Sequence, residues 1–511
     1  MTVLNAARRS ADLTGLFARA DPVDVLVIGG GVTGVGAALD AATRGLSVAL
    51  VEAHDLAFGT SRWSSKLVHG GLRYLASGGV GIARESAVER HHLMTTIAPH
   101  LIKPVRQIVP DYGDLGTGML VRAGFLAGDA LRRVARTPAE VLPGPQRLSP
   151  LEAVAACPTI RRHGLRGAAS TTDGQLIDDA RLVTAIARTA AGYGAQILTR
   201  VRVVRAGGDG AVVHDEIAGR EFSIAARSVI NATGVWAAGL DQTLSIRPSR
   251  GTHLVFDAAA FGNPTGALTV PIPGSTSRFV FVLPEQLGRV YLGLTDVDAP
   301  GSIPDVPVPD RSEIDFLLDT VNTALAVPVS SADIRGVFAG LRPLIASASR
   351  DGSSLADVSR RHDVRVTDGT MVSVIGGKLT TYRRMAQDAV DAAVSAARLP
   401  ASACVTASVP LVGASASGPA WPGLPESLVA RFGAEAPKVV EAATVDDPLA
   451  PIADGIDVTR AEVEFAFTHE GALTVDDVVH RRTRIGLVPA DGERVRPAVG
   501  EIAARMMNGV G

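Results

Sequence analysis

The sequence of 511 residues contains only two cysteines, Cys157 and Cys404, and no Cys-x-x-Cys pair. This scarcity excludes an iron–sulfur site, a structural zinc cluster and the redox disulfide of a flavin-disulfide reductase. The simplest interpretation of each thiol is a buried apolar side chain. Low cysteine usage and the lack of a secretory signal together predict a reducing, cytosolic setting.

Excess charge and long apolar runs are also missing. The formal net charge of -2 argues against a nucleic-acid binder, which would usually carry a basic surface. No run of about 18 uncharged apolar residues is present, so we expect no membrane-spanning helix. Aromatic residues make up 4% of the chain although hydrophobic residues make up 46%, which suits a large α/β core of Ala, Val and Leu. The length allows two or three domains.

The most informative feature that is present is Gly29-x-Gly31-x-x-Gly34, which directly follows an apolar run. Glu52 stands at the end of the next apolar run. This order predicts strand, glycine turn, helix, second strand and acid. Such glycines let the backbone approach a pyrophosphate at a helix N-terminus, and the acid is placed to bind ribose hydroxyls. The alternative is an ordinary turn between a strand and a helix.

The rest of the first 400 residues alternates between helical and strand patterns. Helices are expected over 84–100, 179–193 and about 380–399, and strands over 196–204, 228–230 and 371–375. Residues 246–298 alternate apolar and polar positions, which is typical of an antiparallel sheet with one ligand-facing side. The nucleotide-binding parts are therefore scattered, with a sheet inserted between them.

Four further segments stand out: the first offers groups that suit a phosphate-rich ligand, and the second allows close approach of the backbone to a bulky cofactor. They read SSKLVHGGLRYL over 64–75, NATG over 231–234, GLRPL over 340–344 and GGKLTTYR over 376–383. In combination these motifs resemble the FAD-dependent glycerol-3-phosphate dehydrogenase family, the aerobic type. The resemblance runs from about residue 22 to about residue 490 and includes the segments 470–477 and 481–484, which are similar to the helical cap of that family.

The resemblance implies an α/β fold. Its parts are a Rossmann-like FAD-binding domain of the glutathione-reductase/D-amino-acid-oxidase type, an inserted antiparallel-sheet substrate domain and a C-terminal helical cap domain. The expected division is a leader over 1–20, an FAD-binding domain over 21–105, 165–240 and 331–398, a substrate domain over 106–164 and 241–330, and the helical domain over 399–511.

The resemblance also implies which residues contact FAD. They span the glycine turn, the serine-rich segment, one strand, the NATG turn and the start of the last core helix. The predicted set is Gly29, Gly31, Gly34, Glu52, Ser64, Ser65, Lys66, Val203, Thr233, Gly234, Leu379 and Thr380. A helix N-terminus at the last two would stabilise negative charge on the reduced flavin. No metal site is expected.

Substrate residues follow from the same resemblance. Arg73, Tyr74, Arg360, Lys378 and Thr381 match family positions around the substrate phosphate and flavin. A phosphate monoester carries about 1.5–2 negative charges at neutral pH, so several cations are physically warranted. Taken alone, each arginine is more often a surface charge, and Arg361 and Arg365 are alternatives to Arg360.

Two residues are assigned to catalysis. Arg342 matches the arginine near the reacting carbon, and His253 matches a histidine on the inserted sheet. Arginine stays charged, whereas histidine titrates near neutral pH, so His253 is the preferred base and Arg342 orients the oxygen. A structural histidine is the alternative. The family often has Gly-Thr-Thr-Asp where this chain has Leu294 before Thr295 and Asp296, which puts a hydroxyl contact in doubt.

The implied reaction is the oxidation of sn-glycerol 3-phosphate to dihydroxyacetone phosphate by hydride transfer to FAD. The implied electron acceptor is a membrane quinone. An oxidase that uses oxygen and a non-catalytic flavin-retaining interaction protein remain alternatives, and the phosphate-directed cations argue against an amine substrate. The sequence leaves open whether the chain forms a homodimer.

Membrane attachment is a separate hypothesis. Residues 118–136 combine apolar side chains with four arginines, which would suit the headgroup region of an anionic membrane. The basic stretch Arg481–Arg484 is a second candidate. The alternative for 118–136 is a helix packed on the core with solvated arginines. The expected location is cytoplasmic or peripheral on the inner face of the cell membrane.

Overall fold

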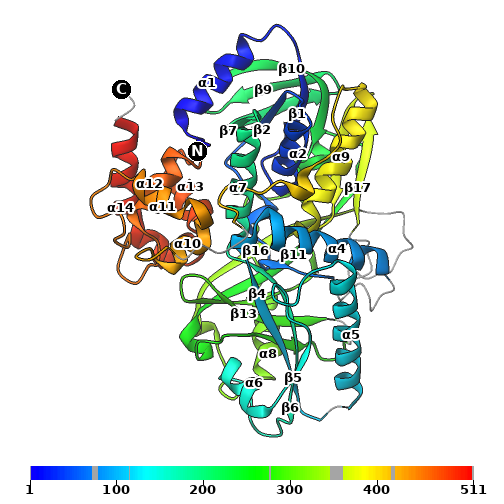
Figure 1. Cartoon of the computed structure of the whole chain (residues 1–511), viewed down its shortest axis with the longest axis vertical. Helices are drawn as coiled ribbons and strands as arrows, with labels where there is room; N and C mark the ends of the chain where they lie inside the picture. The colour runs from blue at the N-terminus through cyan, green and yellow to red at the C-terminus, as the bar shows by residue number, and fades with distance from the viewer. Residues whose placement is uncertain are drawn as a thin grey trace.

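The computed structural model describes residues 2–71, 79–113, 115–275, 278–345, 361–415 and 421–508. Its centre is two sheets, one above the other in Figure 1, with the C-terminal helices in orange and red beside them. The expected α/β architecture, with an inserted sheet and a C-terminal helical region, is confirmed.

The first sheet has the order β17-β18-β10-β1-β2-β7. Its strands are β17 (His362–Thr367), β18 (Met371–Gly376), β10 (Arg220–Asn231), β1 (Val23–Ile28), β2 (Val48–Glu52) and β7 (Gln196–Thr199), with β8 (Val201–Gly207) and β9 (Gly210–Asp215) alongside. All neighbours in this order are parallel except β17, which pairs antiparallel with β18. Parallel strands buried on both faces explain the continuous apolar runs.

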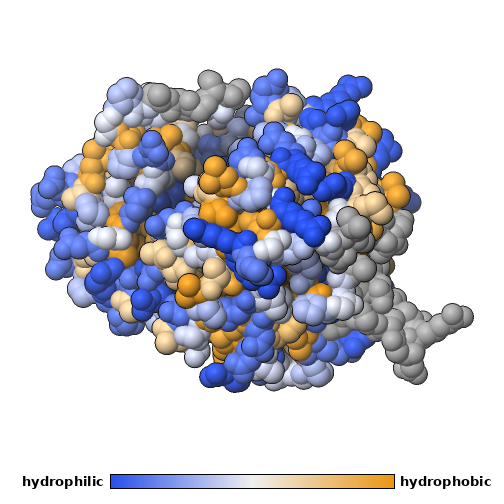
Figure 2. Space-filling model, turned by 90° about the horizontal axis from the view of Figure 1, so that it is seen from below, coloured by the Kyte–Doolittle hydropathy of each residue, from blue (hydrophilic) through white to orange (hydrophobic). Residues whose placement is uncertain are grey.

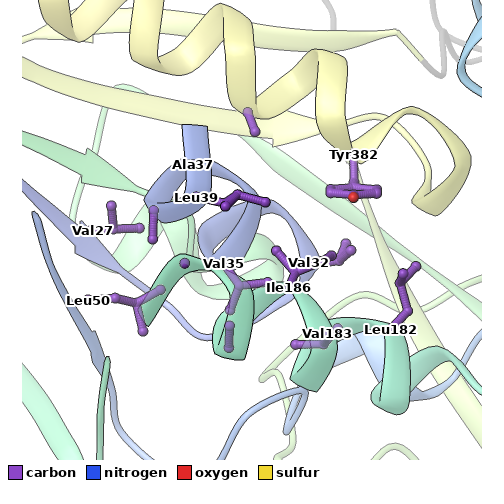
Figure 3. Packing of buried hydrophobic residues seen from close by; sticks show 14 of the residues in the cluster. Val27, Val32, Val35, Ala37, Leu39, Leu50, Leu182, Val183, Ile186 and Tyr382 are labelled. Atoms are coloured by element: carbon purple, nitrogen blue, oxygen red, sulfur yellow. The ribbon is translucent and has the colours of Figure 1, made fainter. Parts of the chain in front are cut away.

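Helices cover both faces of this sheet. On one face α2 (Val32–Thr43) packs against α7 (Asp179–Gly192) and α9 (Tyr382–Ala397). Figure 3 shows their side chains meeting in a cluster that joins strand residues such as Val27 and Leu50 to Val35 and Ile186. On the other face α1 (Ala6–Phe17) places Leu13 against β1 and β2. The segment 1–20, which was expected to be a leader, therefore contains a helix that packs on the sheet.

The second sheet has the order β15-β11-β14-β13-β12-β4-β6-β3, with β16 beside β11 and β5 beside β6. The bounds are β15 (Val297–Asp298), β11 (Ile246–Asp257), β14 (Arg289–Gly293), β13 (Phe279–Glu285), β12 (Ala267–Pro271), β4 (Ile102–Asp111), β6 (Gly167–Leu176), β3 (Leu67–Val68), β16 (Ile334–Ile345) and β5 (Gln146–Leu148). Its core is shared with α6 (Pro150–Ala156) and α8 (Arg311–Asn322).

Strand pairing differs from the expected division of the chain at three strands. The strand β6 pairs with β4 over its whole length and also with β3, and β16 pairs with β11 from Ile345 back to Ile334. The strands β3, β6 and β16 lie in ranges that were expected to belong to the FAD-binding domain, 21–105, 165–240 and 331–398. The division as a whole stays a prediction.

Two helices lie beside the junction of the sheets, α4 (Val80–His92) and α5 (Leu115–Val134). In Figure 1, α5 runs along the lower right of the molecule. The C-terminal region holds α10 (Glu426–Phe432), α11 (Ala436–Glu441), α12 (Arg460–Thr468), α13 (Val475–Asp477) and α14 (Pro489–Asn508). Of the helices within the described ranges, none is long and apolar enough to span a bilayer.

Candidate active site

A cavity of about 1100 Å³ lies between the two sheets. The residues around it come from the glycine turn after β1, the end of β2, the NATG turn after β10, the strands β11 and β16, and the turn before α9. Segments that are hundreds of residues apart in the chain thus form one site. Its walls include both apolar side chains and convergent polar groups, as in cofactor pockets.

The glycine turn has the conformation that a pyrophosphate site needs. Gly29 has a φ of +109°, and a Cβ there would lie 2.7 Å from the backbone oxygen of Ala232. A Cβ on Gly34 would lie 1.9 Å from the oxygen of Gly29, so α2 packs directly on the turn. The backbone N–H of Val32 at the start of α2 donates to Ser61 Oγ at 2.9 Å. Only glycine fits this close approach.

Glu52 lies at the edge of the cavity with both carboxylate oxygens held by backbone donors. Its Oε2 accepts from the N–H of Gly30 at 2.6 Å, and its Oε1 accepts from the N–H of His54 at 2.8 Å. Burial raises the pKa of Glu52 despite these two bonds. The carboxylate therefore fixes the glycine turn while it faces the cavity, and the cradle and acid together fit the adenosine diphosphate half of FAD.

Three other predicted cofactor contacts also line the cavity. Val203 lies on β8, and Thr233 and Gly234 follow β10. The hydroxyl of Thr233 donates to Asn231 Oδ1 at 2.7 Å, while Asn231 Nδ2 donates to the oxygen of Ala237 at 3.0 Å. The asparagine of NATG thus holds the turn from inside the sheet.

The serine-rich segment is divided between the cavity and a buried ion pair. Ser64 and Ser65 line the cavity. Ser64 donates to Asp179 Oδ2 at 2.7 Å, and Lys66 Nζ donates to the same oxygen at 2.7 Å. Lys66 is 1% exposed and its ammonium faces Asp179 rather than the cavity. Its predicted contact with FAD would therefore have to come from the backbone.

His253 and Arg342 lie on the neighbouring strands β11 and β16. His253 Nε2 shares a hydrogen bond of 2.8 Å with Ser65 Oγ, and the ring stacks on Phe338 at 4.7 Å between centroids. Burial, followed by the positive charges of Lys66 and Arg342, lowers the pKa of His253 to about 3. The imidazole is therefore neutral at neutral pH and has a nitrogen that can take up a proton. Its Nδ1 has no hydrogen-bond partner among the described residues.

Arg342 is oriented by three acceptors. Its Nη1 lies 3.2 Å from Ser249 Oγ and 3.2 Å from Asp296 Oδ1, and its Nη2 donates to the oxygen of Thr295 at 3.2 Å. The motif residues Thr295 and Asp296 thus line the cavity next to the guanidinium. A planar cation held this way can face an oxygen that gains negative charge.

The GGKLTTYR segment forms the turn before α9. Lys378, Leu379 and Thr380 line the cavity, and Lys378 Nζ donates to Ser86 Oγ on α4. Thr381 is buried, with its hydroxyl 3.3 Å from the oxygen of Lys378, so its side chain stabilises the turn. The predicted substrate residues Arg73, Tyr74 and Arg360 lie outside the described residues.

Several residues at the site were missed in the sequence. Ser61 bonds the start of α2, Asp179 binds Ser64 and Lys66, and the inner side of α5 lines the cavity with Val121 and Phe125. The acid at the start of a predicted helix was the only signal for Asp179. The amphipathic pattern of α5 was visible, but the pattern does not indicate what each face touches.

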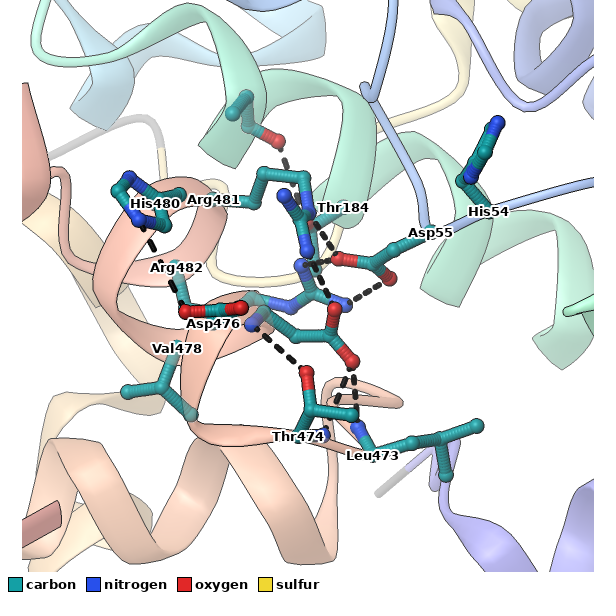
Figure 4. A network of polar contacts seen from close by, with 12 residues as sticks. His54, Asp55, Thr184, Leu473, Thr474, Asp476, Val478, His480, Arg481 and Arg482 are labelled. Carbon is teal, nitrogen blue, oxygen red and sulfur yellow. Dashed lines mark hydrogen bonds and ion pairs between the residues drawn. The ribbon is translucent and has the colours of Figure 1, made fainter. Parts of the chain in front are cut away.

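The basic stretch Arg481–Arg484 was wrongly considered as a membrane-binding surface. Arg481, Arg482 and Arg484 are at most 4% exposed. Figure 4 shows Arg481 and Arg482 directed at Asp55, which follows Glu52 by three residues. Buried cations paired with carboxylates cannot meet a lipid headgroup.

Comparison with known proteins agrees with this geometry. Residues 24–383 match the family model described as FAD dependent oxidoreductase, and residues 404–509 match the model described as C-terminal domain of alpha-glycerophosphate oxidase. Glycerol-3-phosphate dehydrogenase 1 of Mycobacterium tuberculosis is 61% identical over 510 residues, which cover 98% of each chain. Glycerol-3-phosphate dehydrogenase of Mycobacterium leprae is 37% identical and the match covers 95% of this chain and 85% of that one.

A solved structure shares the fold. The glycerol-3-phosphate dehydrogenase from Bacillus halodurans complexed with FAD superimposes with a TM-score of 0.74 at 24% identity, over 99% of this chain and 94% of that chain. At this identity the likeness establishes the fold alone. The cofactor predicted from the sequence, FAD, is confirmed by the family match together with the fit of the cradle.

Proposed function

Since the chain belongs to the FAD-dependent glycerol-3-phosphate dehydrogenase family, we propose that it oxidises sn-glycerol 3-phosphate to dihydroxyacetone phosphate and passes the electrons to a membrane quinone. The observation that carries the proposal is that His253, Arg342 and Lys378 line the same cavity as the glycine cradle. A cofactor cradle joined to a cationic pocket suits a small phosphorylated alcohol.

FAD supplies the hydride acceptor when it is bound. In the proposed mechanism, Lys378 binds the substrate phosphate, and Arg342 orients the C2 oxygen and stabilises its developing charge. His253 accepts the hydroxyl proton at Nε2, the nitrogen that faces Ser65. Burial is the largest cause of the low pKa of His253 and keeps the imidazole neutral before the reaction, while the negative phosphate opposes the smaller contribution of Lys66 and Arg342.

Anaerobic addition of glycerol 3-phosphate tests this function directly. The expected result is loss of the flavin absorbance near neutral pH, and glycerol at the same concentration should leave the absorbance unchanged. Lys378→Ala should raise the required glycerol 3-phosphate concentration by at least about tenfold, the loss of a charge-assisted bond. Lys103→Ala is the matched control because Lys103 is an exposed lysine on β4, outside the cavity wall. No bleaching by glycerol 3-phosphate would refute the proposal.

His253→Ala separates chemistry from binding. We expect flavin reduction to slow by about 10²-fold or more, as for the loss of a general base, while substrate binding changes little. The measurement is the rate of bleaching at saturating substrate in a stopped-flow instrument. An unaltered rate would assign the base to another residue.

The proposal of a quinone acceptor is based on the two sides of α5. One side of this helix lines the cavity with Leu120, Val121 and Phe125, and the opposite side exposes Met119 and Leu126, at 70% and 65%. Figure 2, the view from below, shows hydrophobic residues lying among hydrophilic ones on the lower face of the molecule. A lipid-soluble acceptor that approaches along an apolar helix would arrive beside the cofactor cavity.

The oxidase is the second candidate because the C-terminal match is to the alpha-glycerophosphate oxidase model. Reoxidation of the reduced protein distinguishes the two. Rapid reoxidation by a short-chain quinone with little hydrogen peroxide in air supports the dehydrogenase. Stoichiometric hydrogen peroxide in air with no quinone reduction would establish the oxidase instead.

We also propose a cytoplasmic protein that binds the inner face of the membrane peripherally through α5. Arg122 and Arg133 are exposed and flank the apolar side of the helix. Headgroup binding should then need anionic lipid and weaken with salt. Co-sedimentation with anionic liposomes at low salt is expected for the wild type and lost in Leu126→Asp. Equal binding to neutral liposomes would contradict the electrostatic contribution.

A further inference from the structure

Three arginines of the C-terminal region enter the side of the FAD-binding sheet on which the cofactor loops lie. Arg481, Arg482 and Arg484 follow α13 and are all buried. Figure 4 shows the first two converging on Asp55. Arginine is seldom buried without a specific partner, so the groups that these three arginines bind indicate their role.

The first destination is the loop after Glu52. Arg482 binds both oxygens of Asp55 at 2.9 Å, and Arg481 Nε binds Oδ2 at 2.6 Å. Two backbone donors of the same loop reach the cofactor cradle: His54 N–H to Glu52, and Ala57 N–H to the oxygen of Gly30 at 3.0 Å. By fixing Asp55, Arg481 and Arg482 therefore also fix the positions of Glu52 and the glycine turn.

The second destination is the loop that carries the cavity serines. Arg484 Nη2 donates to the backbone oxygen of Arg62 at 2.5 Å, and Arg484 Nε donates to Asp178 Oδ2 at 3.1 Å. The next residue, Asp179, binds Ser64 through both its backbone N–H, at 2.9 Å, and its hydroxyl. One arginine thus fixes the loop from the two sides.

The junction is a dense network of buried opposite charges. Its cations are Arg62, Lys66, Arg481, Arg482 and Arg484, and its carboxylates are Asp55, Asp178, Asp179 and Asp477, with Glu52 and Glu470 close by. Burial and the neighbouring charges of Arg481 and Arg484 lower the pKa of Arg62 to about 9.

We propose that the C-terminal helical region is a clamp on the FAD-binding loops, in which Arg481, Arg482 and Arg484 are positioning residues for cofactor retention. They do not touch the cavity themselves. They hold the 52–66 segment, which carries Glu52, Ser61, Ser64 and Ser65, in the shape that FAD requires. This role goes beyond the proposed reaction and does not depend on which acceptor takes the electrons.

The test compares Arg482→Gln with Arg188→Gln. Arg188 on α7 is a matched control because it also makes a buried two-bond ion pair with the C-terminal region, to Glu435 at 2.7 and 3.0 Å, but touches neither cofactor loop. The holoenzymes are diluted, and the appearance of free-FAD fluorescence gives the rate of FAD release. Thermal unfolding of each holoenzyme is recorded in parallel.

We expect Arg482→Gln to release FAD at least about tenfold faster than the wild type, a difference of about 1.4 kcal/mol. Arg188→Gln should lower the melting temperature but keep FAD release within about twofold of the wild type. Arg482→Lys, which keeps the charge and loses the fork, should release FAD at an intermediate rate and serves if the Gln variant does not fold. Equal FAD release from Arg482→Lys and the wild type, or from Arg482→Gln and Arg188→Gln, would overturn the clamp.

Discussion

Replacing Gly34 by Ala should remove FAD from the protein, whereas the same change at Gly36, on the same helix, should not. A Cβ on Gly34 would lie 1.9 Å from the backbone oxygen of Gly29, and real Cβ atoms stay beyond about 3.0 Å. The two must therefore separate by about 1.1 Å, the difference of these values. Neither is a side chain that can rotate away, so α2 has to move off the glycine turn.

At Gly36 the added Cβ would meet side-chain atoms instead, Tyr382 Cδ2 at 3.0 Å and Ala386 Cβ at 3.1 Å. These neighbours need to yield only a few tenths of an ångström, and alanine gains about 1 kcal/mol of helix propensity over glycine. In enzymes, a displacement of about 1 Å at a positioned site can lower the reaction rate about 10²-fold, and we take a loss of the same order for FAD affinity. We expect an FAD affinity at least about 100-fold weaker for Gly34→Ala and within about threefold of the wild type for Gly36→Ala.

The assay is fluorescence titration of each apoprotein with FAD, with the ratio of flavin to protein absorbance of the purified variants as a second readout. Thermal unfolding of the apoproteins shows whether each variant folds. If a folded Gly34→Ala binds FAD as tightly as Gly36→Ala, the contact between α2 and the turn does not set the shape of the cofactor site. Equal loss of FAD in both variants would mean that any added methyl group within α2, and not the contact between Gly34 and the glycine turn, weakens FAD binding.

Three further predictions follow from the site. Glu52→Ala should weaken FAD binding by at least about tenfold, because the N–H groups of Gly30 and His54 lose their acceptor along with the ribose; unchanged affinity in a titration would contradict this. Arg342→Lys should lower kcat more than it raises KM, since the planar fork is lost while the charge stays; steady-state kinetics decides, and a pure KM effect would assign Arg342 to binding. His253 has a folded pKa of about 3 against 6.5 unfolded, so its contribution to stability is present above pH 6.5 and is lost as the pH falls toward 3. Between pH 7 and pH 5 His253→Gln should lose about 2 kcal/mol less stability than the wild type in thermal unfolding; equal losses would show that His253 is not buried and neutral.

The parts of this site that could be predicted from the sequence are those coded by short-range patterns. The glycine turn and Glu52 lie within one βαβ unit, so their spacing fixes their geometry. The NATG and GGKLTT turns follow directly on buried strands, and their backbone exposure to the cavity follows from that position.

What could not be predicted depends on partners far away in the chain. Ser64 and Asp179 are separated by 115 positions, and Arg482 and Asp55 by 427. Nothing local distinguishes an arginine that is buried by a distant carboxylate from one that is solvated, so Arg482 was read as surface charge. The same difficulty affects β6 and β16, which lie in ranges expected to bind FAD but pair within the second sheet, since strand partners are not coded by the strand itself.

The central place of β1 in its sheet has a consequence during synthesis of the chain. Its neighbour β2 follows within about 20 residues, but its other neighbour, β10, ends at Asn231, 203 positions after Ile28. At about 5–20 residues per second, a ribosome needs about 10–40 seconds to cover that distance. For that time one edge of a strand made for burial on both faces has no partner, and the cavity wall is completed only when Met385 has been added. The newly made chain therefore needs protection of this edge, by a chaperone or by temporary pairing, well before it can hold FAD.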